Sequence, residues 1–348
     1  MGSSSVRLAD WNFAGEVGRR VAGSGVPVAA VDRARLREDL AERVFLAESL
    51  VSTTTGLSPP RHRARAWVMS RGDWISANLK SLQRLLEPLA ERLVTGDRGD
   101  IRRKALGGQV GGLLGYVSRK VIGQYDVFLP ADDEGLIYFV GPNVAEAERR
   151  FALPPEDFRL WISIHEVTHR AQFAAAPWLR GYLRKLIDAY FSTIQVDPKE
   201  IMKQIRRAAD EVRAGAEWKS LGGIFLLMSP EQRELFSKMQ SMMSLLEGHA
   251  SFVMNEAARD HVRDVERMRR ALRERRRTSG IERSFQRAIG FDTKVKQYDA
   301  GERFVRTAFA RAGANGLNLV WRREENLPTM EEIADADRWV ERVAGNLS

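Results

Sequence analysis

Apolar residues recur every three to four positions along most of the chain, which places them on one face of an α-helix. The pattern is clearest in Leu79, Leu82, Leu86, Leu89 and Leu93, and Asp73 is placed to cap the start of that helix. Further helices are expected over residues 10–22, 32–52, 178–191 and 295–311. The hydrophobic pattern therefore predicts a mainly α-helical protein.

Two runs rich in aromatic and branched residues break this pattern and indicate strands. They are Tyr125–Leu129 and Leu136–Val140, and the six residues between them are mostly turn formers. We therefore expect a β-hairpin, which Ala66–Met69 could join to form a small sheet.

Glycines repeat at four-residue spacing in Gly107, Gly111 and Gly115. Small residues at this spacing leave one helix face without side chains. The segment lacks the Gly-Lys-Ser or Gly-Lys-Thr ending of a phosphate-binding loop. Close packing against another helix is therefore the preferred interpretation.

The composition is that of a soluble globular protein. The chain has 348 residues, and 44% hydrophobic residues are enough to bury a sizeable core. It contains no cysteine, which excludes disulfides, thiolate-bound metals and a thiol nucleophile. Any metal must be held by histidines and carboxylates. The first 25 residues lack an apolar run, and no stretch of about 18 apolar residues occurs, so we expect a cytoplasmic protein without a membrane span.

Positive charge is concentrated in residues 263–277, which carry eight arginines and three acidic residues in a chain of net charge +9. A basic helix is one signature of nucleic-acid binding. Here acidic residues interleave with the arginines and no aromatic residue accompanies them. A solvated helix is therefore the preferred interpretation, and nucleic acid is not an expected partner.

The residues best suited to chemistry form an HExxH motif, His165-Glu166-Val167-Thr168-His169, in a helical stretch that begins after Pro154-Pro155. Positions i and i+4 lie on one helix face, so both imidazoles can reach one zinc ion. Glu166 then lies beside the metal, where it can take a proton from a zinc-bound water and pass it to a leaving group. Arg170 departs from the usual peptidase pattern, which has an uncharged residue after the motif.

A catalytic zinc needs a third protein ligand, and the candidates lie on a second long helix. Ser229-Pro230-Glu231-Gln232 is typical of a capping box with proline at the first helical position, and an apolar run follows to about Ala258. Glu247 and His249 interrupt this run. They are about 200° apart around a helix, so both cannot bind one metal.

The stretch Glu247-Gly248-His249-Ala250 resembles the EGxA sequence in which some gluzincin-type peptidases supply a glutamate ligand, which favours Glu247. The alternative for Glu247 is an ion pair with an arginine. For His249 we expect a core position with a hydrogen bond to a carboxylate, and the alternatives are support of a ligand or metal binding. His261 is about 21 Å further along the helix and His62 lies on a basic loop, so neither is expected at the site.

Several stretches together resemble the actinobacterial zincin-like metallopeptidase family, type 2. The resemblance rests on Phe158–Trp161, His165–Arg170, Gln172-Phe173, Pro177–Arg180 and Leu245–Ala250, supported by Asp10-Trp11, Gly123–Asp126, Gly141–Asn143, Lys294, Gln297-Tyr298, Leu327–Thr329 and Trp339-Val340. It implies a mainly helical zincin-like fold and a zinc hydrolase, and some relatives are associated with deazaflavin coenzyme biosynthesis. An arginine after HExxH is usual in this family. The resemblance also makes Tyr298 a candidate to stabilise an oxyanion, with simple packing as the alternative.

We therefore expect a single zincin-like domain over residues 1–348, mainly α with a small β-hairpin or sheet, in which the HExxH helix packs against the second long helix. Its parts are a helical segment 1–123, a hairpin and zinc-site core 124–260, and a helical segment 261–348. The expected strand Leu136–Val140 precedes the HExxH helix as the edge strand does in zincins, so an extended peptide is expected to add to it.

The functional hypothesis is a zinc-dependent metallohydrolase, more specifically a peptidase, that acts on a peptide or a small amide or ester. His165, His169 and Glu247 would hold Zn²⁺, and Glu166 would be the general base. The alternative is a helical scaffold or binding protein with a structural or vestigial zinc site.

Overall fold

The computed structural model describes residues 7–26, 30–93, 100–126, 135–193, 228–276 and 291–345. These residues form mainly α-helices and a small three-stranded sheet, as the sequence predicts. They divide into two groups. The first group lies within Met1–Thr54, Ser58–Ala171 and Met254–Arg276, and the second lies within Thr55–Leu57, Gln172–Val253 and Arg277–Ser348. The prediction of a single domain stays a prediction.

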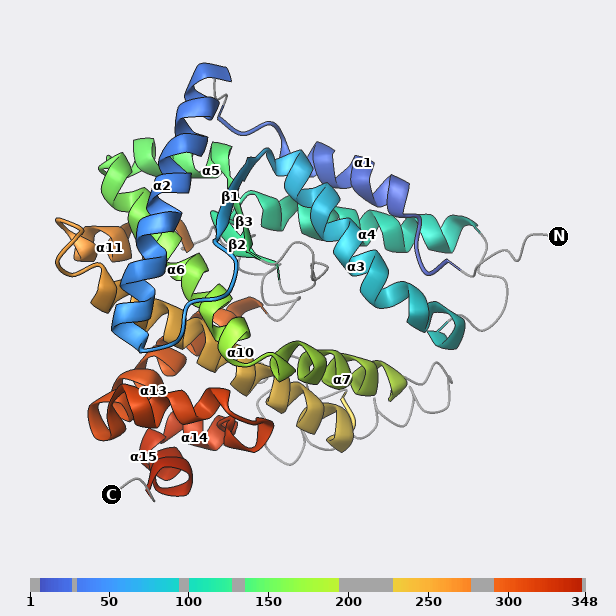
Figure 1. Cartoon of the computed structure of the whole chain (residues 1–348). Helices are drawn as coiled ribbons and strands as arrows, with labels where there is room; N and C mark the ends of the chain where they lie inside the picture. The colour runs from blue at the N-terminus through green and yellow to red at the C-terminus, as the bar shows by residue number, and fades with distance from the viewer. Residues whose placement is uncertain are drawn as a thin grey trace. The chain divides into compact units, whose positions relative to one another are not determined.

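Three helices of the first group, α1 (Trp11–Ala22), α3 (Arg71–Leu93) and α4 (Asp100–Ser118), pack against one another (Figure 1). The glycine face of α4 makes the closest contact, because a Cβ on Gly111 would lie 2.2 Å from Ala14 O of α1. Gly115 meets the backbone of Gly18 in α1 in the same way, and Gly107 meets the backbone of Asp10, the residue before α1. The expected close helix packing is confirmed.

The starts of α1 and α3 follow from side-chain capping. Asp10 caps α1, since its carboxylate accepts from Phe13 N–H at 2.9 Å. The sequence suggested Asp73 as the cap of α3, and this prediction is wrong. Ser70 is the cap, because its hydroxyl accepts from Asp73 N–H while the Asp73 carboxylate accepts from Ser70 N–H. The two residues form a reciprocal box, and the helix begins at Arg71.

The sheet has the strand order β1-β3-β2, with β1 (Arg65–Met69), β2 (Gly123–Tyr125) and β3 (Leu136–Val140). β2 and β3 are antiparallel, as the hairpin prediction requires, but β2 ends at Tyr125, where the expected strand Tyr125–Leu129 begins. Residues 127–134 lie outside the described part. The run that includes Ala66–Met69 joins the sheet as β1, parallel to β3.

The expected role of Leu136–Val140 as a peptide-binding edge strand is wrong. β3 is the central strand and is paired on both sides, so its backbone has no free edge to offer. All five of its residues are buried. A continuous apolar run is the pattern of a strand covered on both faces, which is typical of a central position.

The remaining helices of the first group are α2 (Ala30–Thr55), α5 (Gly141–Arg150), most of α6 (Pro155–Ala175) and α11 (Val265–Arg276). The last residue of α2, Thr55, is assigned to the second group. α6 begins at Pro155, because proline suits the first helical position, where an N–H has no helical partner. Buried aromatic side chains on α6, Phe158 and Trp161, are central parts of the core. The HExxH motif therefore lies on a well-anchored helix.

The second group contains α7 (Trp178–Ser192), most of α10 (Pro230–Ala257), α13 (Phe291–Leu317) and the C-terminal elements. The expected capping box of α10 is confirmed, since Ser229 and Gln232 exchange hydrogen bonds of 2.9 and 3.1 Å. The C-terminal elements are η2 (Asn318–Trp321), η3 (Glu324–Asn326), α14 (Met330–Ala334), α15 (Ala336–Trp339) and η4 (Val340–Ala344). None of the described helices is long and apolar enough to cross a membrane.

Candidate metal centre

The two histidines of the HExxH motif face each other on α6. Their Nε2 atoms are 3.2 Å apart, and their rings meet edge to face with centroids 4.8 Å apart. Two nitrogens that bind one zinc ion at about 2.1 Å in tetrahedral geometry lie about 3.4 Å apart. The spacing of His165 and His169 on a single helix therefore fits a shared metal ion.

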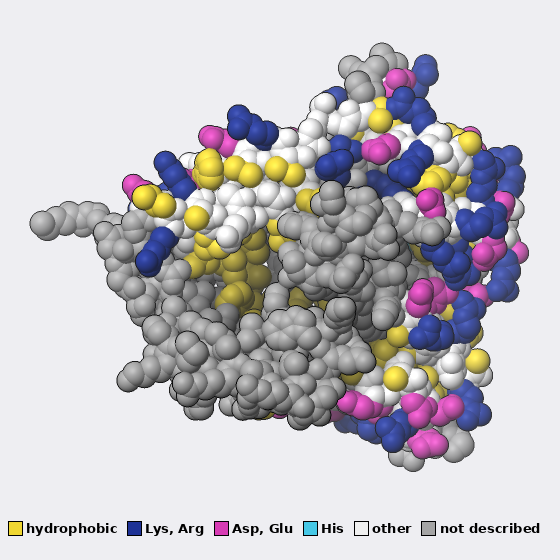
Figure 2. All heavy atoms as spheres, turned by 180° about the vertical axis from the view of Figure 1, so that it is seen from behind, with side chains coloured by type: hydrophobic (Ala, Val, Ile, Leu, Met, Phe, Trp, Pro, Cys, Tyr) yellow, Lys and Arg dark blue, Asp and Glu magenta, His cyan; other side chains and the backbone are white. Residues whose placement is uncertain are grey.

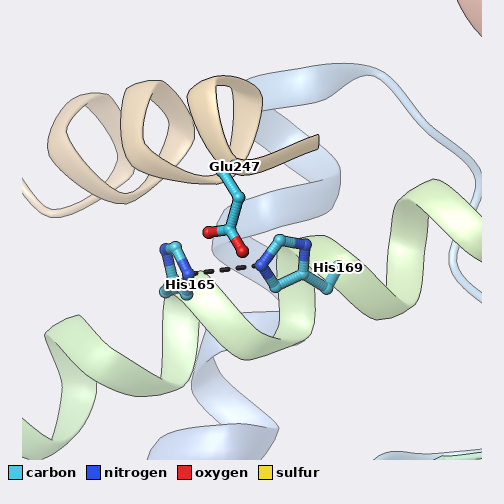
Figure 3. A group of neighbouring side chains, drawn as sticks. All are labelled: His165, His169 and Glu247. Atoms are coloured by element: carbon cyan, nitrogen blue, oxygen red, sulfur yellow. Dashed lines mark hydrogen bonds between the residues drawn. The ribbon is translucent and has the colours of Figure 1, made fainter. Parts of the chain in front are cut away.

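Glu247 of α10 completes a group of three ligand residues (Figure 3). One ligand atom from each of His165, His169 and Glu247 lies within 4.8 Å of the other two, and all three side chains are half-buried. Figure 3 shows the carboxylate pointing toward the two imidazoles. Two imidazoles and one carboxylate are a donor set that suits a catalytic zinc site.

Contacts between α6 and α10 hold Glu247 near the motif. Gln172 follows His169 on α6, and its amide nitrogen donates to Leu246 O at 2.9 Å, next to Glu247 in the chain. The same nitrogen is 3.0 Å from Nδ1 of His249, which is buried and packs edge-on against Trp321. His249 therefore has an amide partner on α6. The sequence pointed to a carboxylate and did not identify Gln172 as a partner.

Glu166 is buried and lies against the sheet. Its Oε2 accepts a hydrogen bond from Tyr125 N–H of β2 at 2.9 Å. A Cβ on Gly123 would lie 2.7 Å from Glu166 Oε1, so this position of β2 must be glycine for the carboxylate to fit. Neither Gly123 nor Tyr125 was predicted as a residue of the site. The sequence offered only the resemblance of Gly123–Asp126 to the family. In the structure Gly123 lies within β2, where a glycine often marks a close approach.

The contacts of Arg170 explain why a charged residue follows the HExxH motif. Its guanidinium is almost fully buried, donates to Glu48 at 2.6 Å and also donates to the carbonyl of His62. Arg170 therefore ties α6 to α2 and to the loop before β1. His62 contributes this carbonyl and is not among the three ligand residues, in agreement with its exclusion from the metal site.

The comparisons with known proteins agree with this geometry. Residues 9–340 match the family of zincin-like metallopeptidases. The chain belongs to this family. It is also similar to a protein from Chloroflexus aurantiacus, whose crystal structure is described as that of "a putative hydrolase with a novel fold". The two share 33% identity over 97% of this chain and 99% of the other, with a TM-score of 0.72. No curated protein matches the chain.

Membership of the zincin-like family implies a metal, usually zinc, and together with the similar structure it supports a metallohydrolase. The expected resemblance and the mainly α zincin-like fold class are confirmed. Tyr298 lies within α13, but its side chain is outside the described part, so its role stays a prediction. His261 is exposed and follows the end of α10.

The arginines of the basic segment make contacts within this zincin-like protein. Arg263 pairs with Asp157 at 3.1 Å, and Arg267 donates to the carbonyls of Phe151 and Ala152. Burial lowers the pKa of Arg275 to about 10, and its guanidinium donates to Arg119 O. Figure 2 shows Lys and Arg side chains interspersed with Asp and Glu on the visible surface. These observations favour the structural interpretation of this helix over nucleic-acid binding, and Arg277 lies outside the described part.

Proposed function

We propose that the protein is a zinc-dependent peptidase or related amide or ester hydrolase in which His165, His169 and Glu247 hold the metal. The observation that carries the proposal is the convergence of two imidazoles and one carboxylate within 4.8 Å, with Glu166 next to His165 in the chain. When bound at such a site, zinc supplies a Lewis acid that polarises a carbonyl and makes a water molecule more acidic.

Glu166 is the general base in this proposal. Its carboxylate takes a proton from the attacking water and delivers it to the leaving nitrogen or oxygen of the substrate. The hydrogen bond from Tyr125 N–H and the close contact with Gly123 hold the carboxylate in one orientation. A base that is already oriented loses less conformational freedom when it acts, which favours catalysis.

His249 is proposed to support the site without binding the metal. Its ring is buried between α6 and Trp321, and Nδ1 receives the Gln172 amide. Nδ1 is therefore occupied by this hydrogen bond. His249 also lies about 200° around the helix from Glu247, so its other nitrogen, Nε2, cannot face a metal that Glu247 faces. Glu247, whose carboxylate points toward the two histidines, is therefore the better third ligand.

The test separates metal binding from catalysis in two variants. Glu166→Gln is expected to keep about one zinc per chain, because the ligands are intact, but to lose hydrolysis of fluorogenic peptides by about 10²- to 10⁴-fold. Glu247→Ala is expected to lose both zinc and activity. Zinc per chain is measured by mass spectrometry of the purified proteins after reconstitution with zinc.

Matched controls lie on the same two helices. Glu156→Gln on α6 and Glu234→Ala on α10 alter exposed carboxylates, so both are expected to keep zinc and activity. Unchanged peptide turnover in Glu166→Gln would overturn its role as the base. A Glu247→Ala protein that retains zinc as well as the wild type does would overturn the ligand set.

A further inference from the structure

Gln172 continues the metal-binding face of α6. His165, His169 and Gln172 occupy positions i, i+4 and i+7, which lie on the same side of a helix. The side chain of Gln172 is fully buried. Burying an amide is unfavourable unless it forms hydrogen bonds, so its partners indicate what the residue does.

The amide nitrogen of Gln172 binds α10 on both sides of Glu247. Nε2 lies 2.9 Å from Leu246 O and 3.0 Å from His249 Nδ1. A carbonyl oxygen can only accept, so the nitrogen of the amide faces Leu246, and its two hydrogens serve the two acceptors. In this network His249 Nδ1 accepts, and a neutral His249 ring carries its proton on Nε2.

A second set of contacts holds the same turn of α10. Gly248 crosses Gly301 of α13 so closely that a Cβ on Gly248 would lie 2.1 Å from the Gly301 carbonyl carbon. The His249 ring packs against Trp321 with centroids 5.2 Å apart. One residue corresponds to about 100° around a helix. Contacts at Leu246, Gly248 and His249 therefore fix the direction in which Glu247 projects.

We propose that Gln172 is a positioning residue for the metal centre, whose amide holds α10 in the rotation that turns Glu247 toward the two histidines. This role rests on the proposed function, because it requires Glu247 to be a zinc ligand. Gln172→Met keeps the length of the side chain and loses both N–H donors. Its affinity for zinc is expected to fall by about 10- to 100-fold, the range for groups that orient a metal ligand.

Asn326→Leu is the matched control for general loss of stability. Asn326 is also buried in the second group of residues, and its amide nitrogen donates to a backbone carbonyl, Leu319 O, at 2.6 Å. Zinc affinity is measured by competition with a chromophoric chelator, and thermal unfolding is measured on the metal-free proteins. Both variants are expected to unfold at lower temperature, but only Gln172→Met is expected to bind zinc more weakly. An equal loss of affinity in both would overturn the positioning role.

A double-mutant cycle tests whether Gln172 acts through Glu247. Adding Gln172→Met to Glu247→Gln is expected to change the remaining zinc affinity by less than about twofold, because the ligand to be positioned is gone. Losses that multiply would overturn the proposal. If Gln172→Met does not fold, Gln172→Asn replaces it in the zinc-affinity measurement and in the double-mutant cycle. Asparagine keeps the two N–H donors, but its side chain is one methylene shorter and does not reach the same partners.

The two proposals fail in distinguishable ways. A wild-type protein that takes up no zinc after reconstitution would overturn the proposed function and this role with it. Wild-type and Gln172→Met proteins that bind zinc equally tightly would overturn the positioning role alone and leave the metal site in place.

Discussion

At the scale of single residues, the side chains of the HExxH motif make contacts within one helix and with distant segments of the chain. His165 and His169 are four positions apart on one helix, so their shared direction follows from helical geometry alone. Glu166 instead meets Tyr125, which is 41 positions away, and no periodicity in the sequence reports that contact. In the sequence, Gly123 stood out only as part of Gly123–Asp126, one of the stretches that resemble the family. The reason for a glycine at this position is the Glu166 carboxylate that lies against it, and only the folded structure shows this contact.

Arg170 illustrates how a residue that departs from the peptidase pattern can have a structural reason. Its guanidinium is 3% exposed and bonds Glu48 and the His62 carbonyl. Removing one partner of a buried ion pair leaves the other charge poorly compensated. Arg170→Met is therefore expected to lower the free energy of unfolding by about 3 kcal/mol, as measured by urea denaturation at neutral pH.

An exposed ion pair provides the comparison for Arg170. Arg311 and Asp337 are 2.9 Å apart, with side chains 64% and 50% exposed. Solvent screens such a pair, so Arg311→Met is expected to cost less than about 1 kcal/mol. Similar losses in the two variants would contradict a specific role for the buried arginine after the motif.

At the scale of elements, the sequence indicated the glycine face of α4 and the sheet but gave incomplete partners. The spacing of Gly107, Gly111 and Gly115 predicts a close helix contact, while the identity of α1 as the partner depends on tertiary packing. The strand Leu136–Val140 was correctly located and wrongly placed at an edge. Its unbroken apolar run was the signal for a central strand, because both faces are buried.

Two glycines of α4 are expected to respond in opposite directions to the same substitution. A Cβ on Gly111 would lie 2.2 Å from Ala14 O, so Gly111→Ala must push α1 and α4 apart, at a net cost of about 2 kcal/mol. Gly112 has no atom within 4 Å of the added Cβ, so Gly112→Ala is expected to stabilise the helix by about 0.5–1 kcal/mol.

Chemical denaturation of both variants beside the wild type measures the difference. Because the two sites are adjacent on one helix, the intrinsic gain from replacing glycine is similar in both, and the difference isolates the contact with α1. A Gly111→Ala protein as stable as the Gly112→Ala protein would show that α4 and α1 do not pack through the glycine face.

At the scale of the whole molecule, the hydrophobic period was sufficient for the mainly α fold class, and the HExxH motif together with the other matching stretches was sufficient for the family. The long-range supports of the site were not predictable, since Gln172, Tyr125 and the Gly248–Gly301 contact each join segments that are distant in the chain. Each of the two groups of residues has a buried apolar core, with Phe158 and Trp161 in the first and Phe304 and Trp339 in the second. A fold with this much apolar burial does not need a metal to form.

Removing zinc therefore distinguishes a catalytic site from a structural one. A chelator is expected to leave the helical circular dichroism at 20 °C unchanged and to lower the midpoint of thermal unfolding by several degrees. Zinc at about 100 times its dissociation constant contributes about 2.7 kcal/mol through mass action. Loss of helical signal in the chelated protein would instead support a scaffold whose zinc is structural, because structural zinc sites couple binding to folding.

The variants with altered ligands make this experiment specific to the proposed centre. Glu166→Gln retains the three ligands, so its midpoint is expected to fall with chelator as far as that of the wild type. Glu247→Ala lacks a ligand and is expected to melt at the same temperature with and without chelator, because it has little bound zinc to lose. A chelator shift that persists in Glu247→Ala would place the stabilising zinc at other residues and contradict the assignment of Glu247.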